Sequence, residues 1–155
     1  MSGEPITIEV VDPLSTDAQF CLNAYFAELA ERFDEGFDAG QSSAPDAAAF
    51  QPPHGVMLVA LSDGAPVGCG GLKFVPDGTA EVKRVWVSPT VRGRGLAKQL
   101  MAELEARAAE RVDIVRLDTN QTLTEAIAMY RGLGYYEIDD FNNERYAHHW
   151  FEKRL

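Results

Sequence analysis

Cysteine is scarce in this chain of 155 residues, which contains only Cys21 and Cys69. The sequence has no Cys-x-x-Cys pair and no cluster of cysteine with histidine, so it lacks the spacing of a structural zinc site. The two cysteines lie in different predicted elements. We therefore expect two free, buried thiols, as in a reducing cytosol, and no disulfide.

Long hydrophobic runs are also absent. No apolar stretch approaches the roughly 20 residues that are needed to span a bilayer. Residues 1–13 lack a basic segment followed by an apolar one, which argues against a signal peptide. We expect a cytoplasmic protein that does not bind membranes.

Basic residues are outnumbered, with 14 Lys and Arg against 24 Asp and Glu and a formal net charge of −10. This charge repels a phosphate backbone, so we expect no nucleic-acid partner. It favours neutral or cationic partners instead. The length, together with a hydrophobic content of 46%, is typical of one globular domain covering residues 1–155.

The apolar pattern predicts seven strands, at 6–11, 56–61, 67–75, 80–87, 114–119, 135–138 and 147–155. Two helices are expected to begin with capping boxes, Thr16 with Gln19 and Thr122 with Glu125. A short helix is expected at 46–50 and a longer one at 96–108. This order predicts an α+β fold with a mostly antiparallel sheet and helices on both faces.

A turn with the sequence Arg-Gly-Arg-Gly, at 92–95, follows the strand 80–87 and opens a helix. Glycines let the backbone approach a ligand, and the first N–H groups of a helix have no partner within it. With the helix dipole and two arginines, such a turn can bind an anion. A P-loop is excluded because Leu96 follows Gly95. On these residues alone, a solvated surface turn explains the pattern equally well.

Three further features accompany the turn. The pattern Arg-x-x-Gly-x-Ala follows a strand that ends in Val-Ser-Pro, the hairpin 56–75 precedes it, and Ala126-x-x-x-Tyr130-x-x-x-Gly134-Tyr135 comes near the end. In this order the chain resembles the GCN5-related N-acetyltransferase (GNAT) family over nearly its whole length. The resemblance implies a mixed, mostly antiparallel sheet of about seven strands, splayed at its middle, and acetyl-CoA as the cosubstrate.

The resemblance also implies where acetyl-CoA binds. Main-chain groups of Val85 and Val87 would pair with the pantetheine arm, and the amides of 93–98 would hold the pyrophosphate. Many family members carry an asparagine where this chain has Leu123, and we expect Asn120 to substitute. The expected cofactor contacts are Val85, Trp86, Val87, Arg92, Gly93, Arg94, Gly95, Leu96, Ala97, Lys98 and Asn120.

Two residues match the family's acid and base positions. Glu81 matches a general base, which often acts through water, and Tyr130 matches a general acid near the cofactor sulfur. A phenol is protonated at pH 7 and can donate its proton. The structural alternatives are a solvated Glu81 paired with Lys83 or Arg84, and a Tyr130 that only fills the core.

In the family, the acceptor enters between the first helices and the loop joining the last two strands, here 26–37 and 141–149. Both segments carry aromatic and acidic residues that could hold a cationic amine. His148 and His149 are adjacent and face opposite sides of a strand, so we expect no shared metal. The expected acceptor contacts are Phe33, Phe37, Tyr146 and His148.

The expected function is transfer of an acetyl group from acetyl-CoA to a primary amine of a small molecule, such as an amino acid, polyamine or xenobiotic. Two alternatives stay open: acetylation of a protein lysine or N-terminus, and a non-catalytic sensor of acetyl-CoA. A sensor would need neither Glu81 nor Tyr130. A homodimer is also expected by analogy, through the final strand around Trp150 and Phe151.

Overall fold

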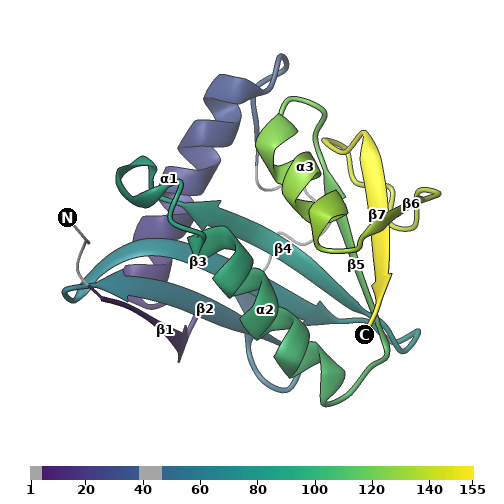
Figure 1. Ribbon diagram of the computed structural model, residues 1–155, viewed down its shortest axis with the longest axis horizontal. Coiled ribbons are helices and arrows are strands. Elements are labelled where there is room, and N and C mark those ends of the chain that lie inside the picture. The colour runs from purple at the N-terminus through teal and green to yellow at the C-terminus, as the bar shows by residue number, and fades with distance from the viewer. Residues whose placement is uncertain (1–4, 39–46) are drawn as a thin grey trace.

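The computed structural model describes residues 5–38 and 47–155. Seven strands form one sheet in the order β1-β2-β3-β4-β5-β7-β6 (Figure 1). Their neighbours pair antiparallel except for β4 and β5, which pair parallel. The predicted α+β fold with a mixed, mostly antiparallel sheet is confirmed. The strands are β1 (Ile6–Val11), β2 (Gly55–Ser62), β3 (Ala65–Phe74), β4 (Ala80–Val87), β5 (Ile114–Thr119), β6 (Tyr136–Ile138) and β7 (His149–Arg154).

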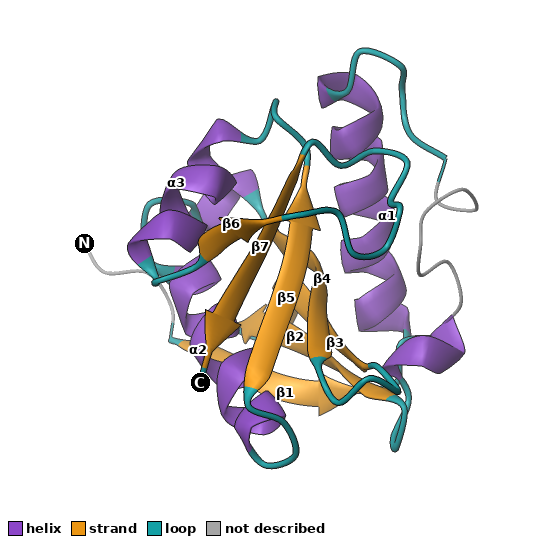
Figure 2. Ribbon diagram, turned by 90° about the vertical axis from the view of Figure 1, so that its right-hand side faces the viewer, coloured by secondary structure: helices purple, strands orange, loops and turns teal. Residues whose placement is uncertain are grey.

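Helices cover both faces of the sheet, as predicted, with α1 on one face and α2 and α3 on the other (Figure 2). This explains why β2 is a continuous apolar run, since both of its faces are buried. Cys21 of α1 and Cys69 of β3 are free and buried in one core cluster, also as predicted. The helical elements are α1 (Thr16–Arg32), η2 (Ala47–Phe50), η3 (Pro89–Val91), α2 (Leu96–Ala109) and α3 (Thr124–Gly132).

Among the residues that the structure describes, none of these helices has the length and apolar character of a membrane span. The short helix predicted at 46–50 is present as η2, and its first predicted residue, Asp46, lies outside the described residues. The single-turn η3 was not predicted, because a three-residue turn after Ser88 leaves no periodic signal in the sequence.

The sheet is split between β4 and β5. These two strands pair only at Ala80 with Val115 and at Glu81 with Arg116, and then diverge. A bulge accompanies the split: Arg84 has a left-handed φ of 61°, and the register between β3 and β4 shifts beside it. The far half of β4 therefore has no strand partner on its β5 side, and a ligand can pair there as an added strand would, although the Val87 carbonyl already accepts from Arg92 Nε at 2.9 Å.

Both predicted capping boxes are wrong. The N-cap of α1 is Ser15, whose hydroxyl accepts from the Ala18 amide at 3.3 Å. The N-cap of α3 is Leu123, without a side-chain bond, because Thr122 donates instead to the side-chain oxygen of Asn120. Neighbouring serines and threonines compete for the cap, and the preceding turn decides between them.

The final strand is not an edge strand, although the predicted dimer contact through Trp150 and Phe151 assumed that it is. β7 lies between β5 and β6, and Phe151 is fully buried. The edges of the sheet are β1 and β6. The sequence pattern indicates that a strand exists but not its position in the sheet. That position depends on long-range pairing, which inserts β7 between β5 and β6.

Candidate active site

A large cavity, of about 410 Å³, lies at the split of the sheet. Its walls come from α1, the far half of β4, the turn before α2, and α3. Most of the residues expected to contact the cofactor meet here, although Arg94 and Asn120 do not line this cavity. Those that line it are Val85, Trp86, Val87, Arg92, Gly93, Gly95, Leu96, Ala97 and Lys98.

The turn at one end of this cavity has the geometry of an anion site. Gly93 and Gly95 have left-handed φ values of 81° and 79°, which cost other L-residues roughly 1–2 kcal/mol each. Gly95 is the N-cap of α2 and has no side chain to bond the first-turn amides. Those N–H groups, with the positive end of the helix dipole, are left for a ligand.

A chain of ion pairs lies along the lining of the large cavity, and no local sequence pattern predicts it. Glu28 on α1 accepts from the guanidinium of Arg92 and from the indole N–H of Trp86, the latter at 3.3 Å. Arg32 bonds Glu28 at 3.4 Å and Glu125 on α3 at 3.0 Å. An anionic ligand at the turn would therefore compete with Glu28 for Arg92.

A small cavity, of about 100 Å³, lies beside the large one. It is formed by α1, the bulged part of β4, the end of β5 and the loop before β7. The two cavities share six lining residues, and we call this shared region the junction. Its residues are Tyr25, Leu29, Val85, Leu123, Ala126 and Tyr130.

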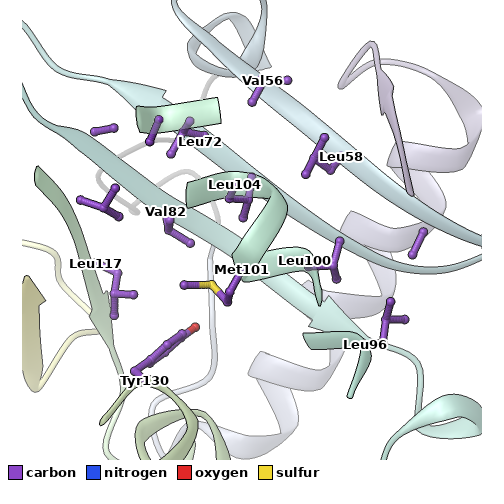
Figure 3. Packing of buried hydrophobic residues seen from close by; sticks show 14 of the residues in the cluster. Val56, Leu58, Leu72, Val82, Leu96, Leu100, Met101, Leu104, Leu117 and Tyr130 are labelled. Carbon is purple, nitrogen blue, oxygen red and sulfur yellow. The ribbon is translucent and has the colours of Figure 1, made fainter. Parts of the chain in front are cut away.

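Tyr130 is at this junction and is only 7% exposed. Its side chain lies at one end of the core cluster, near Met101 and Leu117 (Figure 3). No described residue hydrogen-bonds its hydroxyl. Burial, and next the negative charge of Asp118, hold the pKa of this phenol well above its usual value. The hydroxyl is therefore a protonated donor on a residue that lines both cavities.

Asp118, at the end of β5, brings a carboxyl group into the small cavity. Its Oδ2 accepts from the Lys83 ammonium at 3.0 Å, and Lys83 also contacts Glu144 at 3.4 Å. Burial raises the pKa of Asp118 above its usual range, although Lys83 and the amide of Asn142 act against that rise. Such a carboxyl is a better proton acceptor near neutral pH than an exposed one.

Glu81 is 4% exposed and lines neither cavity. Asn142 links it to the small cavity, because its amide donates to Glu81 at 3.0 Å and to Asp118 at 2.7 Å. The other oxygen of Glu81, Oε2, is 3.7 Å from the ammonium group of Lys73.

Three of the expected acceptor contacts come together at the wall of the small cavity. Phe37 packs against Tyr146 at 4.8 Å and Phe33 at 5.9 Å between ring centroids, and the Tyr146 hydroxyl accepts from the Asp38 amide. His148 does not join them. Its Nδ1 accepts from the Gln121 amide at 3.1 Å, and it lines neither cavity.

Asn120 lines the small cavity rather than the large one, where the cofactor was expected. Its amide donates to the Tyr146 carbonyl at 2.7 Å, and its side-chain oxygen accepts from Thr122. In this arrangement Asn120 links the loop between β5 and α3 to the segment that contains Tyr146. The sequence did not predict that Asp118, Asn142 and Glu144 meet at the small cavity. In the sequence, Asp118 is a polar residue at the end of a strand, and the other two are polar residues in a loop.

Comparison with known proteins places this geometry in a family. Residues 22–135 match the model of the acetyltransferase (GNAT) family. The chain is 30% identical over 138 residues to the N-alpha-acetyltransferase RimI of Mycobacterium tuberculosis, covering 87% of this chain and 81% of the relative. A Thermoplasma acidophilum PaiA N-acetyltransferase, solved with coenzyme A, is 16% identical with a TM-score of 0.72, over 96% and 99% of the two chains.

Other relatives match over less of their length. An N-acetyltransferase of Schizosaccharomyces pombe is 36% identical over 90 residues, which is 56% of this chain and 55% of that protein. The alignments with this and two further curated relatives span about half of each relative.

Proposed function

This chain belongs to the acetyltransferase (GNAT) family, and from that membership we propose that it transfers the acetyl group of acetyl-CoA to a primary amine of a small molecule. One observation carries the proposal. A cavity that begins at an open helix N-terminus meets a second cavity that holds a buried carboxyl, and Tyr130 stands at their junction.

The large cavity is proposed to hold acetyl-CoA. The first-turn amides of α2 and Arg92 would bind the pyrophosphate, and the pantetheine arm would run along Val85–Val87 at the split in the sheet. This path directs the thioester toward Tyr130. The bound coenzyme A of the Thermoplasma acidophilum relative supports the use of this cosubstrate.

The small cavity is proposed to hold the amine. Asp118 takes a proton from the ammonium group, and the free amine attacks the thioester carbonyl carbon. When the carbon–sulfur bond breaks, Tyr130 gives its proton to the leaving thiolate, and its phenolate takes the surplus proton from the nitrogen of the new amide. Glu81, which does not reach the cavity, acts as a positioning residue by sharing the Asn142 amide with Asp118.

The size of the small cavity favours a small acceptor. Its volume is about 100 Å³, and the packed rings of Phe33, Phe37 and Tyr146 form part of its lining. A lysine within a folded protein would have to displace these rings. A second candidate is the N-terminal amine of a peptide, which is favoured by the name of the Mycobacterium tuberculosis relative.

An assay for released coenzyme A thiol tests the proposal, with parallel panels of small amines and of short peptides with free or blocked N-termini. We expect turnover with small amines. Turnover only with peptides that have free N-termini would show that the acceptor is a peptide N-terminus and not a small amine. Binding of acetyl-CoA in calorimetry without turnover on any panel would favour a sensor, and absence of binding would refute the whole proposal.

We expect Arg92→Ala to weaken acetyl-CoA binding. A hydrogen bond between charged groups contributes about 1.5–3 kcal/mol, so the Kd should rise roughly 10- to 100-fold. Titration calorimetry measures the change. Arg154→Ala, which removes the same charge at the end of β7 outside both cavities, is the control. Equal affinity of the Arg92→Ala and control variants would contradict a pyrophosphate contact.

A further inference from the structure

Tyr25 is a second phenol at the junction of the two cavities, and the sequence indicated only a core position for it. It projects from α1 and lines both cavities, as Tyr130 does from α3. Its ring packs beside that of Phe26, with 5.8 Å between centroids. The junction therefore has phenol groups from two different helices.

The hydroxyl of Tyr25 is kept as a neutral donor. Burial, followed by the nearby Tyr130 and Asp118, holds the pKa of this phenol far above its usual value. No residue in the described ranges hydrogen-bonds this hydroxyl. A ligand that fills the junction and displaces water would offer this hydroxyl a partner, and a donor left there without one would cost about 1–3 kcal/mol.

A thioester at the junction offers two atoms to the phenols. The sulfur is a weak acceptor that needs a proton only as it leaves, and Tyr130 is proposed for that step. The carbonyl oxygen accepts hydrogen bonds already in the ground state and gains a full negative charge when the amine adds to the carbon. A donor that keeps its proton suits this second position.

We propose that Tyr25 is a further catalytic residue, whose hydroxyl donates a hydrogen bond to the acetyl oxygen of bound acetyl-CoA. The inference rests on the proposed acetyl transfer. As the nitrogen–carbon bond forms, the carbonyl π electrons move to oxygen, and Tyr25 stabilises the oxyanion without losing its proton. The electrons then return, the carbon–sulfur bond breaks, and the thiolate takes the proton of Tyr130, whose phenolate takes the surplus proton from the amide nitrogen.

Infrared difference spectroscopy tests this contact without an acceptor amine. Acetyl-CoA labelled with ¹³C at the carbonyl would be bound to the full chain, to Tyr25→Phe and to Tyr130→Phe. A hydrogen bond lowers the C=O stretching frequency, so we expect a lowered frequency in the wild type and in Tyr130→Phe. In Tyr25→Phe the band should lie at a higher frequency than in the wild-type complex. An unchanged band in Tyr25→Phe would overturn the inference.

Kinetics provides the second readout, with the amine found in the thiol assay. Loss of one oxyanion donor typically lowers kcat roughly 10²–10³-fold, and we expect this for Tyr25→Phe with unchanged affinity for acetyl-CoA. Because the hydroxyl has no described internal partner, we expect its removal to leave the folded state intact, which thermal unfolding checks. Tyr136→Phe, a phenol on β6 that bonds Glu152 outside both cavities, is the matched control.

The two experiments separate the inference from the proposed function. A Tyr25-dependent infrared shift without turnover of any amine would support the hydrogen bond and refute acetyl transfer. Turnover by the wild type with the same kcat in Tyr25→Phe would support acetyl transfer and refute the role of Tyr25.

Discussion

A Tyr130→Phe enzyme is expected to turn over roughly 10²–10⁴-fold more slowly than the wild type, because this is the usual contribution of a positioned acid. The ring would still pack against Tyr135 and Phe151, whose centroids lie 5.9 and 6.5 Å away. Only the hydroxyl at the junction is lost. The leaving thiolate would then take its proton from water, so kcat should fall while the affinity for acetyl-CoA stays the same.

The pH dependence adds a second measurement for Tyr130. Its pKa is raised well above the ordinary value near 10 by burial and by the charge of Asp118. The proton is held below that raised pKa and lost above it, so kcat should not decline through loss of this proton until the pH exceeds 10. Steady-state kinetics and calorimetry of Tyr130→Phe, with Tyr136→Phe as the control, check both points. Wild-type turnover in Tyr130→Phe would leave this residue with a packing role alone.

Replacing Asp118 by asparagine is expected to lower kcat/KM by roughly 10²–10⁴-fold, since the proposed proton acceptor is removed. The asparagine keeps the size of the side chain and an oxygen that can face Lys83 and Asn142. In the wild type, activity should fall as the pH drops through the raised pKa of Asp118, because the protonated carboxyl cannot accept another proton. This acid limb should disappear in Asp118→Asn.

Two companion variants make the Asp118 test specific. Asp113→Asn makes the same chemical change on an exposed residue beside the start of β5, and it should behave like the wild type. Glu81→Gln should have a smaller effect than Asp118→Asn, because Glu81 reaches the site through Asn142. A large loss in Glu81→Gln with normal activity in Asp118→Asn would instead make Glu81 the base, as the family resemblance implies.

Local patterns predicted the parts of the site that lie on one continuous segment. The turn at 92–95 and the strand before it act through backbone groups and glycine conformation, which depend on neighbouring residues in the chain. The Tyr130 position followed from the resemblance over a single helix and its Gly134 terminus, and the structure places the side chain at the cavity junction.

Contacts between distant segments could not be read in the same way. Asn142 reaches two strands that are 61 and 24 residues away, and no local signal marks a loop asparagine for that position. The capping boxes failed for a related reason, because Ser15 and Thr16 are equally suitable caps until the preceding turn is formed. His148 was expected to contact the acceptor because it lies in the segment 141–149. In the structure its ring accepts a hydrogen bond from the Gln121 amide instead.

The sequence by itself determined the strands and the longer helices, because these depend on periodicity, and the open helix N-terminus after Gly95, because it depends on adjacent residues. The order of its motifs gave the resemblance to a cofactor-using family. Tertiary structure alone decided that β7 lies inside the sheet, that Asp118 rather than Glu81 faces the small cavity, and that Tyr25 meets the junction opposite α3. The reason is physical: these facts depend on the split of β4 from β5 and on which faces pack together, and both are set by long-range packing.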